Sequence, residues 1–266
     1  MPFSEIMSGI LHPVFKWMHV IAGITWIGLL YFFNFINGHF AATLDADSKK
    51  KVVPELMPRA LFWFRWGAAW TWFTGVLLLY VVYWHGNMSM GETDGNIMFS
   101  EGDVTPWSHS MILLSFVAVF IYDYFYKSSL IKNVRVSTIV SYGFVAGMIY
   151  LMTCCGSFEY RAYNIHIGTM FGTMMAFNVW FRIWPAQQKI ITAIKEGNAP
   201  NGDDVALAGL RSKHNTYMSV PLIWTMINQH HVTWEGMFGI SGEVWLLIMV
   251  ALGLSLIHIS EPTRPY

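Results

Sequence analysis

The chain has 266 residues, of which 55% are hydrophobic and only 12% are charged. A soluble domain has about 25% charged residues, and the mean hydropathy of +0.42 also excludes a disordered chain or a coiled coil. The formal net charge is zero, which gives no basic surface for nucleic acid. We therefore predict an all-α, polytopic helix bundle in a lipid bilayer.

Apolar runs long enough to cross a bilayer recur along the chain. A membrane helix needs about 20 mainly apolar residues. We predict six to seven helices, of which the sixth is short and the last is cut off, at 11–36, 61–84, 108–126, 136–155, 163–184, 217–229 and 243–253. No Gly/Ser linker divides residues 1–253, so we predict a single membrane domain.

Glycine spacings predict where helices approach closely. Gly143 and Gly147 form one GxxxG pair, and Gly168 and Gly172 form another, so we expect helix contacts at both places. The polar segment 185–212 has a Gly/Pro/Asn-rich centre, which predicts two short surface helices around a turn.

Two short features limit the redox chemistry of the chain. Cys154 and Cys155 are adjacent, which excludes both a CxxC site and a CxxCH haem attachment, and we expect two buried thiols. The string LSLIHISEPTR at 254–264 resembles translated adapter sequence from a sequencing library. We interpret 254–266 as this artefact, set His258 aside, and expect the native sequence to continue past Gly253.

Basic residues lie in alternate connections between the predicted helices. Thirteen of the sixteen Lys and Arg residues lie in or beside the connections after the first, third and fifth helices. Cytoplasmic loops carry such an excess. The N-terminus also lacks the basic region of a signal peptide. We therefore predict that the N-terminus lies on the outer side of the membrane and that these connections face the cytoplasm.

Histidines concentrate on the outer side of this topology, where an imidazole inside hydrocarbon is a functional candidate. His19 and His166 lie at similar predicted depths beside small residues, so we take them as candidate axial ligands of haem b. His109 and His230 are reserve candidates. Copper also binds imidazole, and histidines in membrane helices also bond to neighbouring helices, so the spacing alone leaves these alternatives open.

Three further polar residues are candidates for catalysis. Arg65 lies in a tryptophan cluster, where its guanidinium can stack on rings, bind an anion or extend to the membrane surface. His214 and Asn215 open the predicted helix at 217–229 from the cytoplasmic side, as cap residues or as binding groups.

Several motifs occur in a fixed order along the chain. They are HVIAGITWIG at 19–28, WFRW at 63–66, TWFTG at 71–75, HIGTMFG at 166–172, WPAQ at 184–187 and RSKHNTY at 211–217. Together they resemble the membrane domain of the bacterial membrane-bound urate oxidase (urate hydroxylase PuuD) family. The first motif alone also resembles CopD-type copper proteins and HemJ-type protoporphyrinogen oxidases.

The resemblance implies an inner-membrane domain followed by a periplasmic cytochrome c domain that carries haem c. It implies oxidation of the purine urate to 5-hydroxyisourate, with electrons leaving through cytochrome c. The alternatives are a non-catalytic haem b electron-transfer subunit, a HemJ-like porphyrinogen oxidase and a CopD-like copper protein. The chain departs from the family pattern at Gly67, where an acidic residue is expected, and in the short Lys-rich segment 48–58.

Overall fold

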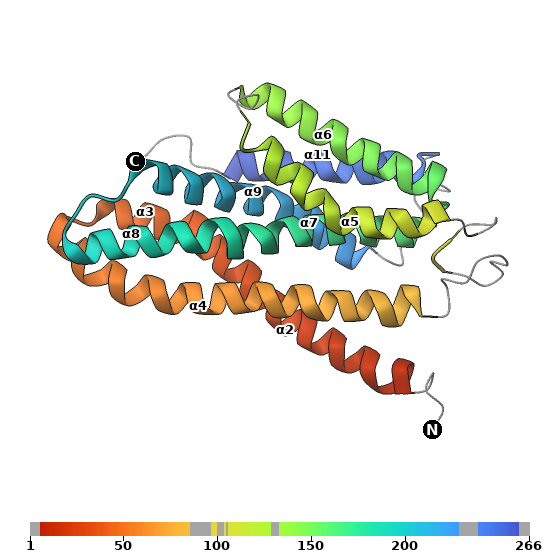
Figure 1. Ribbon diagram of the computed structural model, residues 1–266, viewed down its shortest axis with the longest axis horizontal. Helices are drawn as coiled ribbons and strands as arrows, with labels where there is room; N and C mark the ends of the chain where they lie inside the picture. The colour runs from red at the N-terminus through yellow and green to blue at the C-terminus, as the bar shows by residue number, and fades with distance from the viewer. Residues whose placement is uncertain are drawn as a thin grey trace. The chain divides into compact units, whose positions relative to one another are not determined.

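The computed structural model describes residues 6–85, 97–99, 104, 106–128, 133–228 and 239–260. Within these residues the secondary structure is helical, apart from one antiparallel bridge between Phe99 and Phe158, which confirms the all-α prediction. Figure 1 shows the order of the helices. Contacts divide the chain into two compact units. The first contains the residues up to Leu77, Met175–Ser219 and the residues from Ile257 onward, and the second contains Leu78–Met174 and Val220–Leu256.

The first unit is built around two long helices that cross. Its elements are the π-helical turn η1 (Met7–Leu11), α2 (His12–Tyr31), the π-helical turn η2 (Phe32–Asn37), α3 (Gly38–Thr43), most of α4 (Ala46–Leu79), the π-helical turn η6 (Val179–Ile183), α8 (Trp184–Glu196) and the first part of α9 (Gly202–Ile227). At the crossing of α2 and α4 (Figure 1), a Cβ on Gly67 would lie 3.2 Å from the backbone nitrogen of Trp26. The acidic residue expected at position 67 would therefore press against the backbone of α2 and require the two helices to shift apart.

The start of α4 differs from the sequence prediction. The side chain of Asp45 accepts hydrogen bonds from the backbone and the hydroxyl of Ser48, at 2.9 Å and 2.8 Å, which caps the first turn. These bonds also hold the pKa of the exposed Asp45 carboxyl below its usual value. Segment 48–58 is consequently helical, with Pro54 and Pro58 inside α4, so our predicted start at residue 61 was too late.

Helix α8 runs antiparallel to α4 (Figure 1). Its first residue, Trp184, contacts Arg65, and the glycine after its last residue, Gly197, lies beside Lys50. Gly197 ends α8 with a φ of 81°, a left-handed conformation that favours glycine. The turn predicted in 185–212 is therefore confirmed, but the second helix of that segment is not short, because α9 continues to Ile227.

The second unit is held by polar contacts between its helices. Its elements are the π-helical turn η3 (Tyr80–Trp84), α5 (Pro106–Phe125), α6 (Val134–Tyr150), the π-helical turn η5 (Leu151–Cys155), most of α7 (Tyr160–Asn178), the end of α9 and most of α11 (Gly242–Ser260). The Tyr142 hydroxyl on α6 donates to the carbonyl of Leu247 on α11 at 3.0 Å. The Asn164 amide on α7 donates to the carbonyl of Thr225 on α9 at 3.3 Å.

Four of the described helical stretches are long and apolar enough to cross a membrane. They are Gly9–Thr43, Ala46–Trp84, Pro106–Phe125 and Arg135–Cys155, and Gly242–Gly253 is a shorter apolar helix. The predicted spans at 163–184 and 217–229 fall in α7, η6 and α9, which carry three of the four buried asparagines of the described residues. Those two spans stay predictions from the sequence.

Two packing predictions need correction. Both cysteines of η5 are exposed, so the expected burial of Cys154 and Cys155 was wrong. A Cβ on Gly168 would collide with the side chain of Thr225, which confirms a close approach of α7 and α9 there. Gly143 and Gly147 have nothing within 4 Å of the corresponding position, because they lie on an open face of α6.

Candidate functional site

The imidazole of His19 is fixed against α4. Its Nδ1 lies 3.2 Å from the hydroxyl oxygen of Thr74, and this hydroxyl lies 2.6 Å from the carbonyl oxygen of Trp70. Because the single hydroxyl proton points to Trp70, the hydroxyl accepts from His19, which places the ring proton on Nδ1. The ring lies directly over Gly75, where a Cβ would be 3.1 Å from its Cε1 atom. This arrangement leaves Nε2 as the nitrogen with a lone pair.

In the second unit, His166 also carries its ring proton on Nδ1, because its hydrogen-bond partners require it. Its Nδ1 donates to the carbonyl oxygen of Ala162 at 2.7 Å, and its Nε2 accepts from the indole nitrogen of Trp84 at 3.2 Å. The ring is fully buried, and the ring of Phe158 lies 5.0 Å away between centroids. An aromatic enclosure therefore surrounds the nitrogen that would bind a metal.

Both histidines fit haem iron by donor atom and tautomer. Axial histidines bind through one ring nitrogen while the other donates to a carbonyl or another protein oxygen, as Nδ1 does in His19 and His166. In His166 the iron would take the place of the Trp84 indole on Nε2. His109 lies half-buried on α5, and His230 lies outside the described residues. Within the described part of the chain, no three His, Cys, Asp or Glu side chains group closely enough to share a metal ion.

A partly buried polar cluster joins the first part of α9 to the end of α7 and to η2. We call it the α9 cluster, and its members are Asn34, Asn178, Arg211, Ser212, His214 and Asn215. The amide of Asn178 donates to the side-chain oxygen of Asn215 at 2.9 Å, and the amide of Asn215 donates to the carbonyl of Met175 at 3.0 Å. Both amides are fully buried.

The other side of the α9 cluster is tied to the first helix. Asn34 and Ser212 exchange hydrogen bonds of 2.8 Å and 3.2 Å, and Tyr31 and Ser219 bond through their hydroxyls at 3.0 Å. Asn34 lies in the π-helical turn η2, and Asn178 immediately precedes another, η6. Such turns are frequent at functional sites. The first part of α9 is thus held from two directions.

Charge within the α9 cluster comes from Arg211, whose side chain is 1% exposed. No other Lys or Arg among the described residues is buried to this extent. Burial of the imidazole, with the positive charge of Arg211 as a second cause, lowers the pKa of His214 to about 4. His214 is therefore neutral at pH 7, and each of its ring nitrogens is either a donor or an acceptor.

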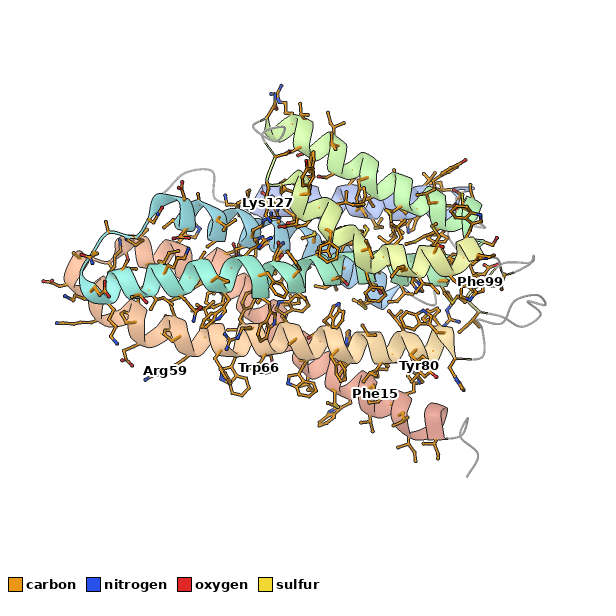
Figure 2. All side chains as sticks on the ribbon, in the orientation of Figure 1. Phe15, Arg59, Trp66, Tyr80, Phe99 and Lys127 are labelled. Carbon is orange, nitrogen blue, oxygen red and sulfur yellow. The ribbon has the colours of Figure 1, made fainter. Side chains whose placement is uncertain are left out.

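Arg65 is engaged by tryptophans. Its guanidinium carbon lies 4.1 Å from the ring centroid of Trp184 and 5.0 Å from that of Trp180. The Trp180 indole also donates to the backbone carbonyl of Arg65 at 3.1 Å. Trp66, labelled in Figure 2, meets the Trp180 ring edge-on at 5.6 Å. These contacts join α4 to η6 and α8, and they account for the arginine in the tryptophan cluster.

The structure groups the predicted site residues unevenly. His19, Arg65, His214 and Asn215 belong to the first unit, and His166 belongs to the second. Sequence reasoning treated Arg211 as one of the basic residues that set the topology and missed its burial. The available signal was the spacing of Arg211 and Asn215, four residues apart and therefore on one face of a helix.

The match to a family model shows to which family the chain belongs. The model described as urate oxidase N-terminal matches residues 45–260. The chain belongs to this urate oxidase family. No curated protein and no solved structure that was compared with the chain matches it. The family match includes Arg65, His166 and the part of the α9 cluster on α7 and α9, whereas His19 and Asn34 precede it.

Proposed function

We propose that this urate oxidase family chain is the membrane domain of a cytochrome-linked urate oxidase in the bacterial inner membrane. The observation that carries the proposal is the family match over residues 45–260. In the proposed reaction, urate and one water give 5-hydroxyisourate, two protons and two electrons. The electrons pass one at a time to cytochrome c, either fused to the chain or separate.

We also propose haem b as the redox centre, with His19 in the first unit and His166 in the second each a candidate ligand. When bound, haem b supplies a one-electron carrier between the two-electron substrate and cytochrome c. The chain contributes the anchoring bonds from Nδ1 to Thr74 and to the carbonyl of Ala162, which orient both rings. Such anchoring also raises the basicity of the coordinating nitrogen.

Spectra of purified protein test the haem proposal. Wild-type protein should show a reduced-minus-oxidised spectrum of the b type, and His19→Ala and His166→Ala should each abolish it or convert it to a high-spin form. Normal spectra in both variants would remove these residues as ligands, and the same test would pass to His109 and His230.

Addition of urate to wild-type membranes tests the activity. Urate should reduce the bound haem, and added oxidised cytochrome c should reoxidise it. Haem that urate cannot reduce, but that exchanges electrons with a quinol or with cytochrome c, would reject the oxidase and favour an electron-transfer subunit.

The proposed orientation places the N-terminus in the periplasm, on the side where a cytochrome c operates. The supporting observation is the concentration of Lys and Arg in alternate connections. Reporter fusions after Lys51 and Lys195 should report the cytoplasm, and a fusion after Gly95 should report the periplasm. A periplasmic signal at Lys195 would overturn this orientation.

A further inference from the structure

We propose that Arg211 is the residue that binds the negative charge of the purine substrate, with Asn215 and His214 beside it. This inference rests on the proposed function and adds the site at which the substrate is recognised. Its ligand class is a planar, anionic, hydrogen-bonding heterocycle, of which urate is the example that the family description names.

Burial makes the Arg211 charge effective. A guanidinium that is 1% exposed interacts with an anion across protein rather than across water, so the same ion pair is several times stronger there. The planar guanidinium also presents parallel N–H donors that match two neighbouring acceptors on the edge of a flat anion. Arg211 therefore has the chemistry that an anionic purine requires.

Hydrogen bonds of neighbouring residues hold the backbone around Arg211 in place before a ligand binds. One turn further along α9, the amide of Asn215 is held by Met175 and Asn178. The next residue after Arg211, Ser212, exchanges hydrogen bonds with Asn34. A site that is ordered before binding loses less entropy when the ligand enters.

Neighbouring groups add hydrogen-bonding specificity without adding charge. Asn215 lies four residues after Arg211 and therefore on the same face of α9. The imidazole of His214 lies within electrostatic range of Arg211 and is neutral at pH 7. A site with one cation, an amide and a neutral imidazole favours a monoanion that both donates and accepts hydrogen bonds over a simple inorganic anion.

Arg65 is the other arginine of the first unit that could meet an anion within the bundle. Its guanidinium stacks on Trp180 and Trp184, so its π-facing surfaces are occupied by protein. Those contacts join helices, whereas the α9 cluster gathers amides and hydroxyls from three segments of the chain. The polar surroundings of Arg211 therefore suit a hydrogen-bonding purine better than the tryptophan rings around Arg65.

The α9 cluster is separate from the proposed haem ligand in the same unit. Tyr31, which bonds to Ser219 beside the cluster, lies twelve residues from His19, or about 18 Å along α2 at 1.5 Å per residue. A change at Arg211 should therefore weaken substrate binding without changing the haem spectrum. This separation gives the experiment two independent readouts.

Equilibrium binding of radiolabelled urate to the full chain in detergent tests the inference. Arg211→Gln keeps a polar side chain of similar length but removes the charge, so we expect urate affinity to fall by about tenfold or more. In turnover with cytochrome c, KM should rise by a similar factor. Arg211→Lys should retain part of the affinity, because the charge stays while the paired N–H donors are lost.

The matched control is Arg59→Gln, which removes the same charge from an arginine of α4 in the same unit whose side chain is 78% exposed. It should bind urate as wild type does. Folded Arg211→Gln protein with wild-type affinity would overturn the inference. If Arg211→Gln does not fold, the urate affinity of Arg211→Lys and the relative affinity of wild type for urate and neutral hypoxanthine test the inference instead. Wild-type protein that binds urate and hypoxanthine equally well would also overturn the inference. Failure of wild type itself to bind urate would reject the proposed function.

Discussion

The Nδ1 atom of His19 lies 3.2 Å from the hydroxyl oxygen of Thr74, across the crossing of α2 and α4. The hydroxyl proton is directed to the Trp70 carbonyl at 2.6 Å, so the hydroxyl can only accept from the imidazole. Ring, hydroxyl and carbonyl form one directed chain of hydrogen bonds. The consequence is a histidine whose tautomer and orientation are set by a neighbouring helix before any ligand binds.

Thr74→Val should weaken haem binding without removing the ligand. Valine has the shape of threonine but cannot accept the Nδ1 proton, so the ring loses its anchor. Loss of such a partner typically lowers the affinity of a metal site 10- to 100-fold. Haem titration into the apoprotein, followed by absorbance, measures the change.

The control for this change is Thr25→Val on α2. The Thr25 hydroxyl bonds only to the carbonyl of Ile21 in its own helix, at 3.1 Å, and contributes nothing to His19. Equal haem affinity in Thr74→Val and wild type would show that the hydrogen bond is dispensable and would remove the support it gives to His19 as a ligand.

Gly168→Ala should destabilise the protein. Its new methyl group would overlap the Thr225 side chain, so α7 and α9 would have to separate. Overpacking of this kind costs about 1–3 kcal/mol. Gly147→Ala places the same methyl group in open space on α6 and should be neutral or slightly stabilising, because alanine favours helix. Thermal unfolding in detergent compares the two, and equal midpoints would contradict the packing of α7 on α9.

The fold was largely predictable from apolar runs, because the length and hydropathy of a helix depend on local sequence. The boundaries of the helices were not predictable in this way. The Lys-rich start of α4 resembles a loop in sequence, but in the structure it is a helix that is capped by Asp45 and lies beside the end of α8. The sequence also could not show which glycines pack closely against another helix. Gly168 and Gly147 have the same spacing motif, but only Gly168 lies against a neighbouring helix.

The sequence predicted which residues could form the site, but not which atoms those residues contact. An imidazole within an apolar helix marks His19 and His166 as candidates, but the Thr74 and Ala162 contacts that fix their tautomers depend on side-chain positions. Arg211 shows the limit most clearly. Its sequence context is a polar connection rich in charge, and its burial depends on the packing of α9 against other segments, which local sequence does not show.

Arg65→Gln should lower the stability of the first unit. The substitution removes two cation–π contacts, with Trp184 at 4.1 Å and Trp180 at 5.0 Å. Contacts of this kind contribute about 0.5–2 kcal/mol each, so the unfolding midpoint should fall by several degrees. Arg65→Lys keeps the charge but loses the flat stacking surface and should recover only part of the loss.

The comparison for Arg65 is Arg59, six residues earlier on α4. Arg59 forms an exposed ion pair with Glu55 at 2.7 Å, and such pairs contribute about 0–1 kcal/mol. Arg59→Gln should therefore change the midpoint much less than Arg65→Gln. Equal midpoints for the two variants would mean that stacking on Trp180 and Trp184 does not hold α4 to η6 and α8.

The depressed pKa of His214 predicts a stability that falls in mild acid. Its pKa is about 4 in the folded chain and about 6.5 in an unfolded chain. Between these values the unfolded chain binds a proton that the folded chain does not, so the free energy of unfolding decreases as pH falls from 6.5 towards 4. One such proton changes it by at most about 1.4 kcal/mol per pH unit. His214→Gln removes this contribution while other titrating groups stay, so the stability difference between wild type and variant should be constant above pH 7 and should shift against wild type below pH 6. Thermal unfolding in detergent at several pH values from 4.5 to 7.5 measures it, and parallel curves for the two proteins would show that His214 is protonated in the folded state as readily as in the unfolded one.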